Sequence, residues 1–314
     1  MTRLIVLVGQ TASGKSDLAV EVAKLLANTV IINIDSRQIY QKLTIGSGKV
    51  EGAWMSQSES SYAPKMMAEL FAEFGDIFVY QDVPHFLIDF VDPHTRFTLS
   101  DFLHAWTELT ARLPQSVENI IAVGGTGLYA KAIIEQYPIS NADLRRAGYQ
   151  RRLEKRMILE LQQIANHLAI PVLNSSDSHN PRRFVSAILR QTFGNTDENL
   201  VDYTQFEQTF VFEKVIEVEL GKTKIKARVE SRVTEGMIEE VENLQLPLSR
   251  LCELGLEYRT IGMYLHGLIA ENDWQALLTT QIIQYARRQR IWNRTQLSAI
   301  PVQTAVDLTN HLKA

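Results

Sequence analysis

The feature that most constrains this chain is an eight-residue loop that follows a short apolar run. Leu4–Val8 is continuously apolar, and the loop after it consists of Gly9, Gln10, Thr11, Ala12, Ser13, Gly14, Lys15 and Ser16. Apolar residues then recur at helical spacing from Ser16 to Leu26. A buried strand, a G-x-x-x-x-G-K-[ST] loop and a helix, in this order, predict a phosphate-binding P-loop.

Each residue type in this loop suits a bound phosphate. The glycines allow the backbone to turn so that its N–H groups face the ligand, and the following helix adds positive potential at its N-terminus. Lys15 would neutralise phosphate charge, and the Ser16 hydroxyl is the expected ligand of Mg²⁺. The loop therefore predicts a diphosphate or triphosphate site with Mg²⁺ as cofactor, and it leaves the reaction open.

Two further apolar runs predict a parallel sheet. Val30–Ile34 ends at Asp35, and Asn119–Val123 ends at Gly124. Buried strands that alternate with helices are typical of parallel sheets. We therefore expect an α/β fold with a P-loop NTPase-like parallel sheet covered by helices on both faces. Phe210–Leu220 is a candidate later strand.

The middle of the chain differs in composition and predicts an inserted helical lobe. Residues 141–167 are rich in Arg, Glu, Leu and Gln, and residues 180–190 continue in that style. We expect residues 1–135 and 206–314 to form the core with C-terminal helices, and residues 136–205 to form the lobe. Lys222–Asn243 and Trp274–Leu297 are expected to be two long helices of the core.

Charge and cysteine content limit the class of protein. The formal net charge is -4, so any binding of nucleic acid must depend on local basic clusters. Such clusters lie at 145–156 and 287–294, although by charge alone both are better interpreted as solvated helix faces. The single cysteine, Cys252, excludes an internal disulfide, and Leu4–Val8 is too short for a membrane span. We expect a cytoplasmic protein that does not engage a membrane.

Two polar segments follow strands at the same edge of the predicted sheet. Asp35-Ser36-Arg37-Gln38 comes after the second apolar run, and Gly124-Gly125-Thr126 comes after the third. Ligands of open α/β sheets bind at the carboxyl ends of the strands, so both segments are expected near the phosphates. Position alone leaves Asp35 equally open to a catalytic role, to capping the next helix and to holding a water of the metal.

Taken in order, these motifs resemble the tRNA dimethylallyltransferase family, also called the tRNA isopentenyl transferases. The resemblance covers nearly the whole chain. Gln10 stands where the family usually has proline, and Ser186 stands where a family arginine usually contacts RNA. The matching positions beyond the P-loop include Asp35-Ser36, Gln38-Ile39-Tyr40, Ile45-Gly46, Pro84-His85, Asp92-Pro93, Gly124 to Tyr129, Arg183, Arg228, Glu240-Val241, Arg288-Gln289 and Trp292-Asn293-Arg294.

The resemblance implies a reaction and a set of residues for it. The dimethylallyl group of dimethylallyl diphosphate would pass to N6 of the adenosine on the 3′ side of the tRNA anticodon, with release of diphosphate. Asp35, Arg228 and Thr11 are the implied catalytic residues, with Asp35 as general base and Arg228 against the leaving diphosphate. The residues implied for tRNA binding are Asp35, Ser36, Arg37, Gln38, Thr126, Arg145, Arg146, Arg182, Arg183, Arg287 and Arg288.

The expected partners are the anticodon stem-loop of tRNA and dimethylallyl diphosphate, and we expect a monomer. Three other functions fit the same P-loop. A small-molecule or nucleotide kinase would turn over ATP, and an isopentenyltransferase acting on free adenine nucleotides would not need the basic lobe. A catalytically silent RNA-binding protein is disfavoured because Lys15, Ser16, Asp35 and Arg228 are all retained. The sequence also leaves open which tRNAs are used, whether ATP competes for the P-loop, and what residues 51–82 contribute.

Overall fold

The structure is a computed structural model that describes residues 2–56, 64–137, 152–153, 156–171, 180–193 and 203–313. The chain divides into two compact units, the first formed by Met1–Gln136 with Tyr203–Ala314 and the second by Tyr137–Asp202. The second unit overlaps the segment expected to be inserted, residues 136–205, and its role in tRNA binding stays a prediction.

One eight-stranded sheet forms the centre of the first unit, with the order β3-β4-β5-β2-β6-β1-β7-β8. Neighbouring strands from β5 to β8 in this order are parallel, whereas β4 is antiparallel to both of its neighbours. The predicted α/β class is therefore confirmed, with an antiparallel edge added. The strands are β1 (Arg3–Val8), β2 (Thr29–Asn33), β3 (Ala53–Met55), β4 (Ile77–Tyr80), β5 (Val83–Phe86), β6 (Asn119–Gly124), β7 (Thr209–Lys214) and β8 (Ile300–Val302).

The antiparallel edge comes from residues 51–82, whose contribution the sequence left open. This segment supplies β3 and β4, with α2 (Lys65–Phe74) between them. Trp54 of β3 packs edge-on against Phe78 of β4, with ring centroids 5.9 Å apart. The segment therefore extends the sheet on the side away from β1.

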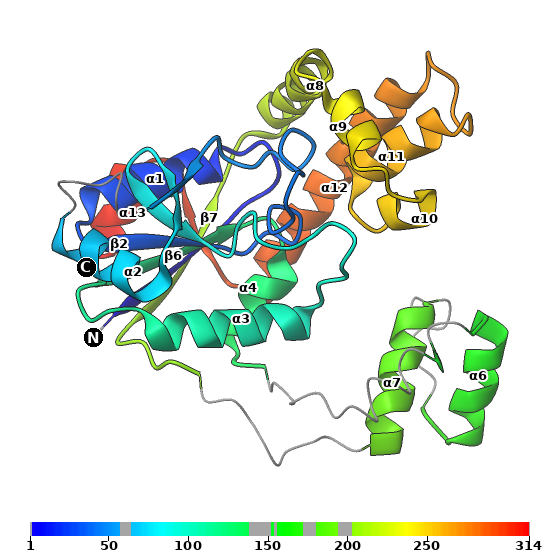
Figure 1. Cartoon of the computed structure of the whole chain (residues 1–314), viewed down its shortest axis with the longest axis horizontal. Helices are drawn as coiled ribbons and strands as arrows, with labels where there is room; N and C mark the ends of the chain where they lie inside the picture. The colour runs from blue at the N-terminus through cyan, green and yellow to red at the C-terminus, as the bar shows by residue number, and fades with distance from the viewer. Residues whose placement is uncertain are drawn as a thin grey trace. The chain divides into compact units, whose positions relative to one another are not determined.

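Helices cover both faces of the central strands. Ile5 and Leu7 of β1 belong to one hydrophobic core with Leu18 of α1 (Lys15–Leu25) and Leu308 of α13 (Ala305–His311). The alternate residues of β1 are buried as well, and Figure 1 shows α3 (Leu99–Arg112) and α4 (Gly127–Ile134) on the side of the sheet opposite α1 and α13. Continuous burial on both faces explains why these strands are unbroken apolar runs.

Of the two long helices that the sequence predicted after β7, Trp274–Leu297 is confirmed as α12, whereas Lys222–Asn243 is not one helix. The structure has α8 (Val218–Thr234), α9 (Met237–Asn243), α10 (Leu248–Leu251), α11 (Leu256–Leu265) and α12 (Trp274–Gln296). A single helix over 222–243 is wrong because Gly236 has a φ of 98°, which ends α8 and begins α9. A strand that continues to Leu220 is also wrong, because the Glu217 side chain accepts hydrogen bonds from the Glu219 and Leu220 N–H groups and starts α8.

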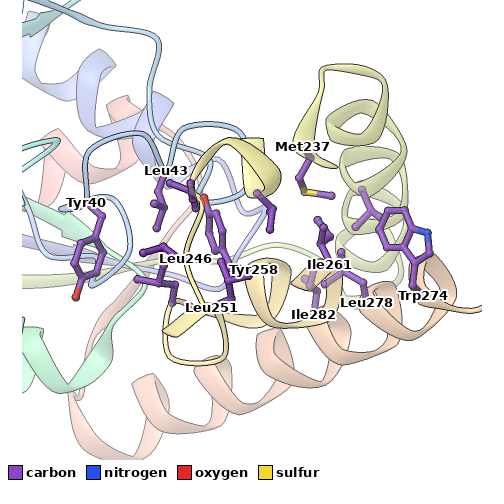
Figure 2. Packing of buried hydrophobic residues seen from close by; sticks show 14 of the residues in the cluster. Tyr40, Leu43, Met237, Leu246, Leu251, Tyr258, Ile261, Trp274, Leu278 and Ile282 are labelled. Carbon is purple, nitrogen blue, oxygen red and sulfur yellow. The ribbon is translucent and has the colours of Figure 1, made fainter. Parts of the chain in front are cut away.

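A second hydrophobic core joins these helices to the loop after β2. Tyr258 and Ile261 of α11 pack with Leu278 and Ile282 of α12, and Leu43 from the loop belongs to the same cluster (Figure 2). The cluster therefore fixes the segment after Asp35 against helices that are some 200 residues away in sequence.

The second unit contains α6 (Ile158–His167) and α7 (Pro181–Phe193) among its described residues. Leu161 of α6 and Ile188 of α7 are fully buried in a small core of their own. In the described ranges of the whole chain, no helix is both long enough and apolar enough to cross a membrane.

Candidate active site

A cavity of about 850 Å³ lies at the carboxyl ends of β1 and β2. Its wall comes from the P-loop, from residues 35–38 and 46–51, and from side chains of α8, α11 and α12. Basic side chains outnumber acidic ones on this wall, so the cavity favours an anionic ligand. The basic residues are Lys15, Arg37, Lys49, Lys224, Arg228 and Arg259, and the acidic ones are Asp17, Asp35, Glu51 and Glu257.

The P-loop has the backbone shape that a phosphate requires. Gly14 has a φ of 80° and directly precedes α1, and Ala12 also has a positive φ of 60°. The Ser13 hydroxyl is buried and has no hydrogen-bond partner among the described residues. A buried polar atom without a partner is costly, so this hydroxyl suits a site that a ligand completes.

The predicted phosphate-binding residues divide into two groups. Gly9, Gln10 and Ser13 are not part of the cavity wall, and Gln10 lies against Gly221 of α8. The residues that reach the cavity are Thr11, Ala12, Gly14, Lys15 and Ser16.

Lys15 and Arg228 are the two cations with the most altered environments. Burial lowers the pKa of Lys15 to about 8, with Asp35 opposing the shift and Arg228 adding to it. Burial also lowers the pKa of Arg228 to about 10, and its neighbour Arg232 contributes in the same direction. A ligand with several negative charges would relieve the repulsion that each of these cations experiences.

Gly48 makes room for Arg228. Gly48 has a φ of 63°, and a Cβ at this position would lie 1.7 Å from Nη2 of Arg228 and 2.2 Å from Nη2 of Arg232. The Gln38 side chain donates a hydrogen bond of 2.9 Å to the Gly48 carbonyl and holds this turn. A side chain at position 48 would displace both guanidinium groups, so the glycine lets Arg228 reach the cavity.

Asp35 is held in a fixed orientation by backbone groups. Its Oδ1 accepts a hydrogen bond of 2.9 Å from the Arg37 N–H, and its Oδ2 accepts one of 3.2 Å from the Gly125 N–H. The Asn33 side chain accepts from the Asp35 N–H and donates to the Asp35 carbonyl. Each carboxylate oxygen therefore keeps capacity for one more proton donor while the group itself cannot turn freely.

The residues predicted around Asp35 take different places. Ser36, Arg37 and Gln38 line the cavity, whereas Thr126 does not. Thr126 Oγ1 accepts a hydrogen bond of 3.0 Å from the Ser36 N–H and donates to the Ser36 hydroxyl. In this structure Thr126 therefore orients Ser36 on the cavity wall.

A turn at residues 44–46 is held by a carboxylate whose role sequence reasoning missed. Glu240 of α9 accepts hydrogen bonds from the backbone N–H groups of Thr44, Ile45 and Gly46, at 2.9, 2.7 and 2.9 Å. The Tyr258 hydroxyl donates to the same carboxylate. Glu240 was visible only as a matching position of the family, because nothing in its own spacing signals a partner some 195 residues away.

Lys49 anchors the far side of this turn. Its Nζ forms an ion pair with Asp89 and donates a hydrogen bond of 2.7 Å to the Tyr40 carbonyl. Burial lowers the pKa of Lys49, and Asp89 opposes that shift. Although Lys49 lines the cavity, its ammonium group is committed to the protein, so Lys15 and Arg228 are the better candidates for contact with an anion.

On the cavity wall, the Ser16 hydroxyl is the predicted ligand for Mg²⁺. Ser16 lies in the first turn of α1 and reaches the cavity. No group of three or more His, Cys, Asp or Glu residues with metal-binding geometry exists within the described ranges. Mg²⁺ bound at phosphates keeps several waters and takes the remaining ligands from phosphate oxygens, so one hydroxyl beside the P-loop fits this ion.

Apart from Arg37, the arginines predicted to bind tRNA are absent from the cavity wall or lie outside the described residues. Arg145 and Arg146 belong to the undescribed part of the chain, and the Arg182 side chain is likewise not described. Arg183 is exposed on α7. Two exposed arginines of α12 complete the set, Arg287 and Arg288, and the guanidinium carbon of Arg288 lies 5.9 Å from the centre of the Tyr285 ring.

Comparison with known families finds two matching family models. The model described as "IPP transferase" matches residues 78–296, and the model described as "Isopentenyl transferase" matches residues 2–64. The chain is 31% identical over 298 residues to a protein of Hahella chejuensis named tRNA dimethylallyltransferase 1, with coverage of 93% of this chain and 88% of that protein. A protein of the same name from Geotalea uraniireducens is 31% identical over 301 residues, with the same coverage of both chains.

Two solved structures have a fold similar to that of this chain. A tRNA isopentenylpyrophosphate transferase of Bacillus halodurans matches with a TM-score of 0.61 and 24% identity, covering 100% of this chain and 94% of that one. A eukaryotic dimethylallyltransferase described as acting on tRNA matches with a TM-score of 0.63 and 18% identity, covering 98% of this chain and 75% of that one.

Proposed function

This chain belongs to the IPP transferase family, and from that premise we propose that it transfers the dimethylallyl group of dimethylallyl diphosphate to a tRNA adenosine. The acceptor atom is N6 of the adenosine on the 3′ side of the anticodon, and diphosphate is released. The observation that carries the proposal is the position of Asp35. Asp35 Oδ2 lies 3.1 Å and Lys15 Nζ lies 3.7 Å from the place that a Cβ on Gly125 would take. The carboxylate and the ammonium group are therefore neighbours on the cavity wall.

The cations of the site act on the leaving group. The bond between C1 of the allyl group and the diphosphate oxygen breaks, and its electron pair leaves with the diphosphate. Since the allylic cation that develops is delocalised, the main requirement is to stabilise the departing negative charge. Lys15 of the P-loop and Arg228 of α8 supply positive charge on the cavity wall, and Thr11 adds a hydroxyl there.

Ser16 is the residue that would hold Mg²⁺ at the diphosphate. When bound, the ion neutralises part of the charge on the phosphate oxygens. The backbone N–H groups at the start of α1 complete the cradle around the same oxygens.

Asp35 acts on the nucleophile. The lone pair of adenine N6 is delocalised into the ring, so removal of a proton as the N6–C1 bond forms assists the attack. The Asp35 carboxylate accepts this proton, and its backbone hydrogen bonds from Arg37 and Gly125 keep it aimed at the cavity. General-base catalysis of this kind raises the reaction rate by about 10²- to 10⁴-fold.

The anticodon stem-loop is the proposed RNA element. An adenine that is stacked in its loop does not reach a carboxylate at the bottom of a cavity, so it must be flipped out of the stack. Single-stranded loops lose little on such unstacking. Arg37 and Gln38 line the cavity beside Asp35, and with Ser36 they are proposed to hold the flipped nucleotide. The arginines of α7 and α12 are proposed to bind the flanking phosphates.

The proposal is tested with labelled dimethylallyl diphosphate and unmodified tRNA. The full chain should transfer label to tRNA, and a tRNA with guanosine in place of the target adenosine should accept none. Parallel reactions with labelled ATP test the kinase alternative, and reactions with AMP test an enzyme that acts on free nucleotides. Transfer to AMP but not to tRNA, or phosphoryl transfer from ATP, would overturn the proposal.

Asp35→Asn tests the role of the carboxylate. This variant should lower the single-turnover rate at saturating substrates by about 10²-fold or more, while tRNA affinity stays nearly unchanged. Glu51→Gln is the matched control, because Glu51 is an exposed carboxylate on the same cavity wall. Recovery of the Asp35→Asn rate at high Mg²⁺ would instead assign Asp35 to the metal and its waters, and a near wild-type rate at ordinary Mg²⁺ would remove it from the mechanism.

A further inference from the structure

Gln289 of α12 connects the P-loop to the loop after β6. Its Oε1 accepts a hydrogen bond of 2.9 Å from the Thr11 N–H, and its Nε2 donates one of 2.8 Å to the Gly125 carbonyl. The side chain is 7% exposed. One buried amide therefore bonds to two loops that are more than 100 residues apart in sequence.

The sheet explains why such a connection is needed at this point. β1 and β6 are paired in parallel as far as Val8 and Gly124, and each strand then leads into a loop. Across the described residues, Gln289 is the only residue with hydrogen bonds to both the P-loop and residues 124–126. Its amide bonds to both loops just beyond the point where the paired strands end.

The orientation of the amide follows from its partners. The Thr11 N–H only donates and the Gly125 carbonyl only accepts. If the Gln289 amide were reversed, its NH₂ group would face the Thr11 N–H and its oxygen would face the Gly125 carbonyl. Burial makes such a mismatch costly. The Gln289 side chain is thus held in one arrangement by both loops.

The connection continues to the carboxylate of the site. Gly125 accepts from Gln289 through its carbonyl and donates through its N–H to Asp35 Oδ2. A series of hydrogen bonds therefore leads from the P-loop through Gln289 and Gly125 to Asp35. The P-loop holds the leaving group and Asp35 serves the nucleophile, so this series spans the two halves of the reaction.

We propose that Gln289 is a positioning residue that sets the distance between the bound diphosphate and the Asp35 carboxylate. This inference rests on the proposed function. Gln289 does not touch the reacting atoms, and it acts through Thr11 and Gly125. A misplacement of about 1 Å between reacting groups can cost about 10²-fold in rate, so loss of the amide should affect the chemical step more than binding.

Gln289→Met tests the proposal, because methionine keeps the length and bulk of the side chain but makes neither hydrogen bond. The single-turnover rate at saturating dimethylallyl diphosphate and tRNA should fall by about 10- to 100-fold. The dissociation constants of both substrates, measured by calorimetry and filter binding, should change by less than about threefold. Gln284→Met is the matched control, since Gln284 is an exposed glutamine of the same helix, and its rate should match wild type.

A double-mutant cycle separates positioning from a general loss of structure. If Gln289 acts through the placement of Asp35, Gln289→Met should cost little more in a protein that already carries Asp35→Asn. A merely structural role would instead give independent, additive losses together with weaker binding of both substrates. Additive losses would overturn the proposal.

Gly125→Ala tests the same contact from the other side if Gln289→Met fails to fold. A Cβ on Gly125 would lie 2.7 Å from Gln289 Nε2 and 3.1 Å from Asp35 Oδ2. The variant keeps the amide but displaces it, and it should reproduce the fall in rate with binding retained. An active wild-type protein with unimpaired Gln289→Met and Gly125→Ala variants would refute the positioning role, whereas an inactive wild-type protein would refute the proposed function instead.

Discussion

Binding of the allylic diphosphate should weaken above pH 8, because Lys15 loses its charge there in the empty site. Burial lowers the pKa of Lys15 from 10.5 to about 8, against the opposing effect of Asp35. The terminal phosphate of the ligand is fully ionised in this range, since its second pKa is about 6. A bound diphosphate favours the charged amine, so the pKa of Lys15 rises again in the complex.

The expected magnitude follows from this linkage. At one pH unit above the pKa, about one molecule in eleven still carries the proton, so the apparent Kd should rise about tenfold per pH unit above 8. The effect of rising pH on the stability of the folded protein has the opposite sign to its effect on ligand binding. The unfolded chain binds more protons than the folded one between pH 8 and 10.5, so Lys15 makes the empty protein more stable as pH rises through this window.

Calorimetry from about pH 7 to about pH 9, below the pKa of about 10 of Arg228, in two buffers with different ionisation enthalpies, measures both the Kd and the proton uptake. Uptake should approach about one proton per binding event at about pH 9. Lys15→Arg should remove the slope, because a guanidinium stays protonated throughout. Lys224→Ala changes another lysine of the cavity wall and should keep it. A flat wild-type Kd, or a slope that survives in Lys15→Arg, would refute the reasoning.

Two further predictions concern the turn at residues 44–46 and the RNA. Glu240→Gln should lower the free energy of unfolding in urea by about 2–4 kcal/mol, because a carboxylate that accepts three backbone N–H groups loses charge-assisted bonds. The exposed Glu242→Gln on the same helix serves as control, and equal stabilities would contradict the role of Glu240. Charge reversal at Arg145, Arg146, Arg151 and Arg152 should weaken tRNA binding and flatten its salt dependence in filter-binding assays. Affinity for dimethylallyl diphosphate should not change, and its loss would indicate misfolding.

The sequence predicted those parts of the candidate site whose residues are close together along the chain. A strand, a P-loop and a helix occupy residues 3–25 without interruption, so the order of residues alone identifies the phosphate site. Asp35 follows a buried strand, and the common edge of a parallel sheet then places it near the phosphates. The structure confirms both strands and brings Asp35 and Lys15 to one cavity.

Helix boundaries in the C-terminal part were less predictable. Residues 222–243 have a helical composition throughout, yet Gly236 takes a left-handed conformation that divides them into α8 and α9. The antiparallel edge formed by β3 and β4 was also not apparent, because pairing direction depends on neighbours that a strand's own sequence does not specify.

What the sequence by itself determined is the phosphate site, the class of sheet and the place of Asp35, because each depends on residues that are adjacent along the chain. Only the tertiary structure decided how that site is held together. The Thr11 N–H finds its acceptor in Gln289, which is 278 residues away, and Glu240 binds a turn some 195 residues before it. Buried polar groups must be satisfied wherever the folded chain brings a partner, and no spacing within the sequence records which partner that is.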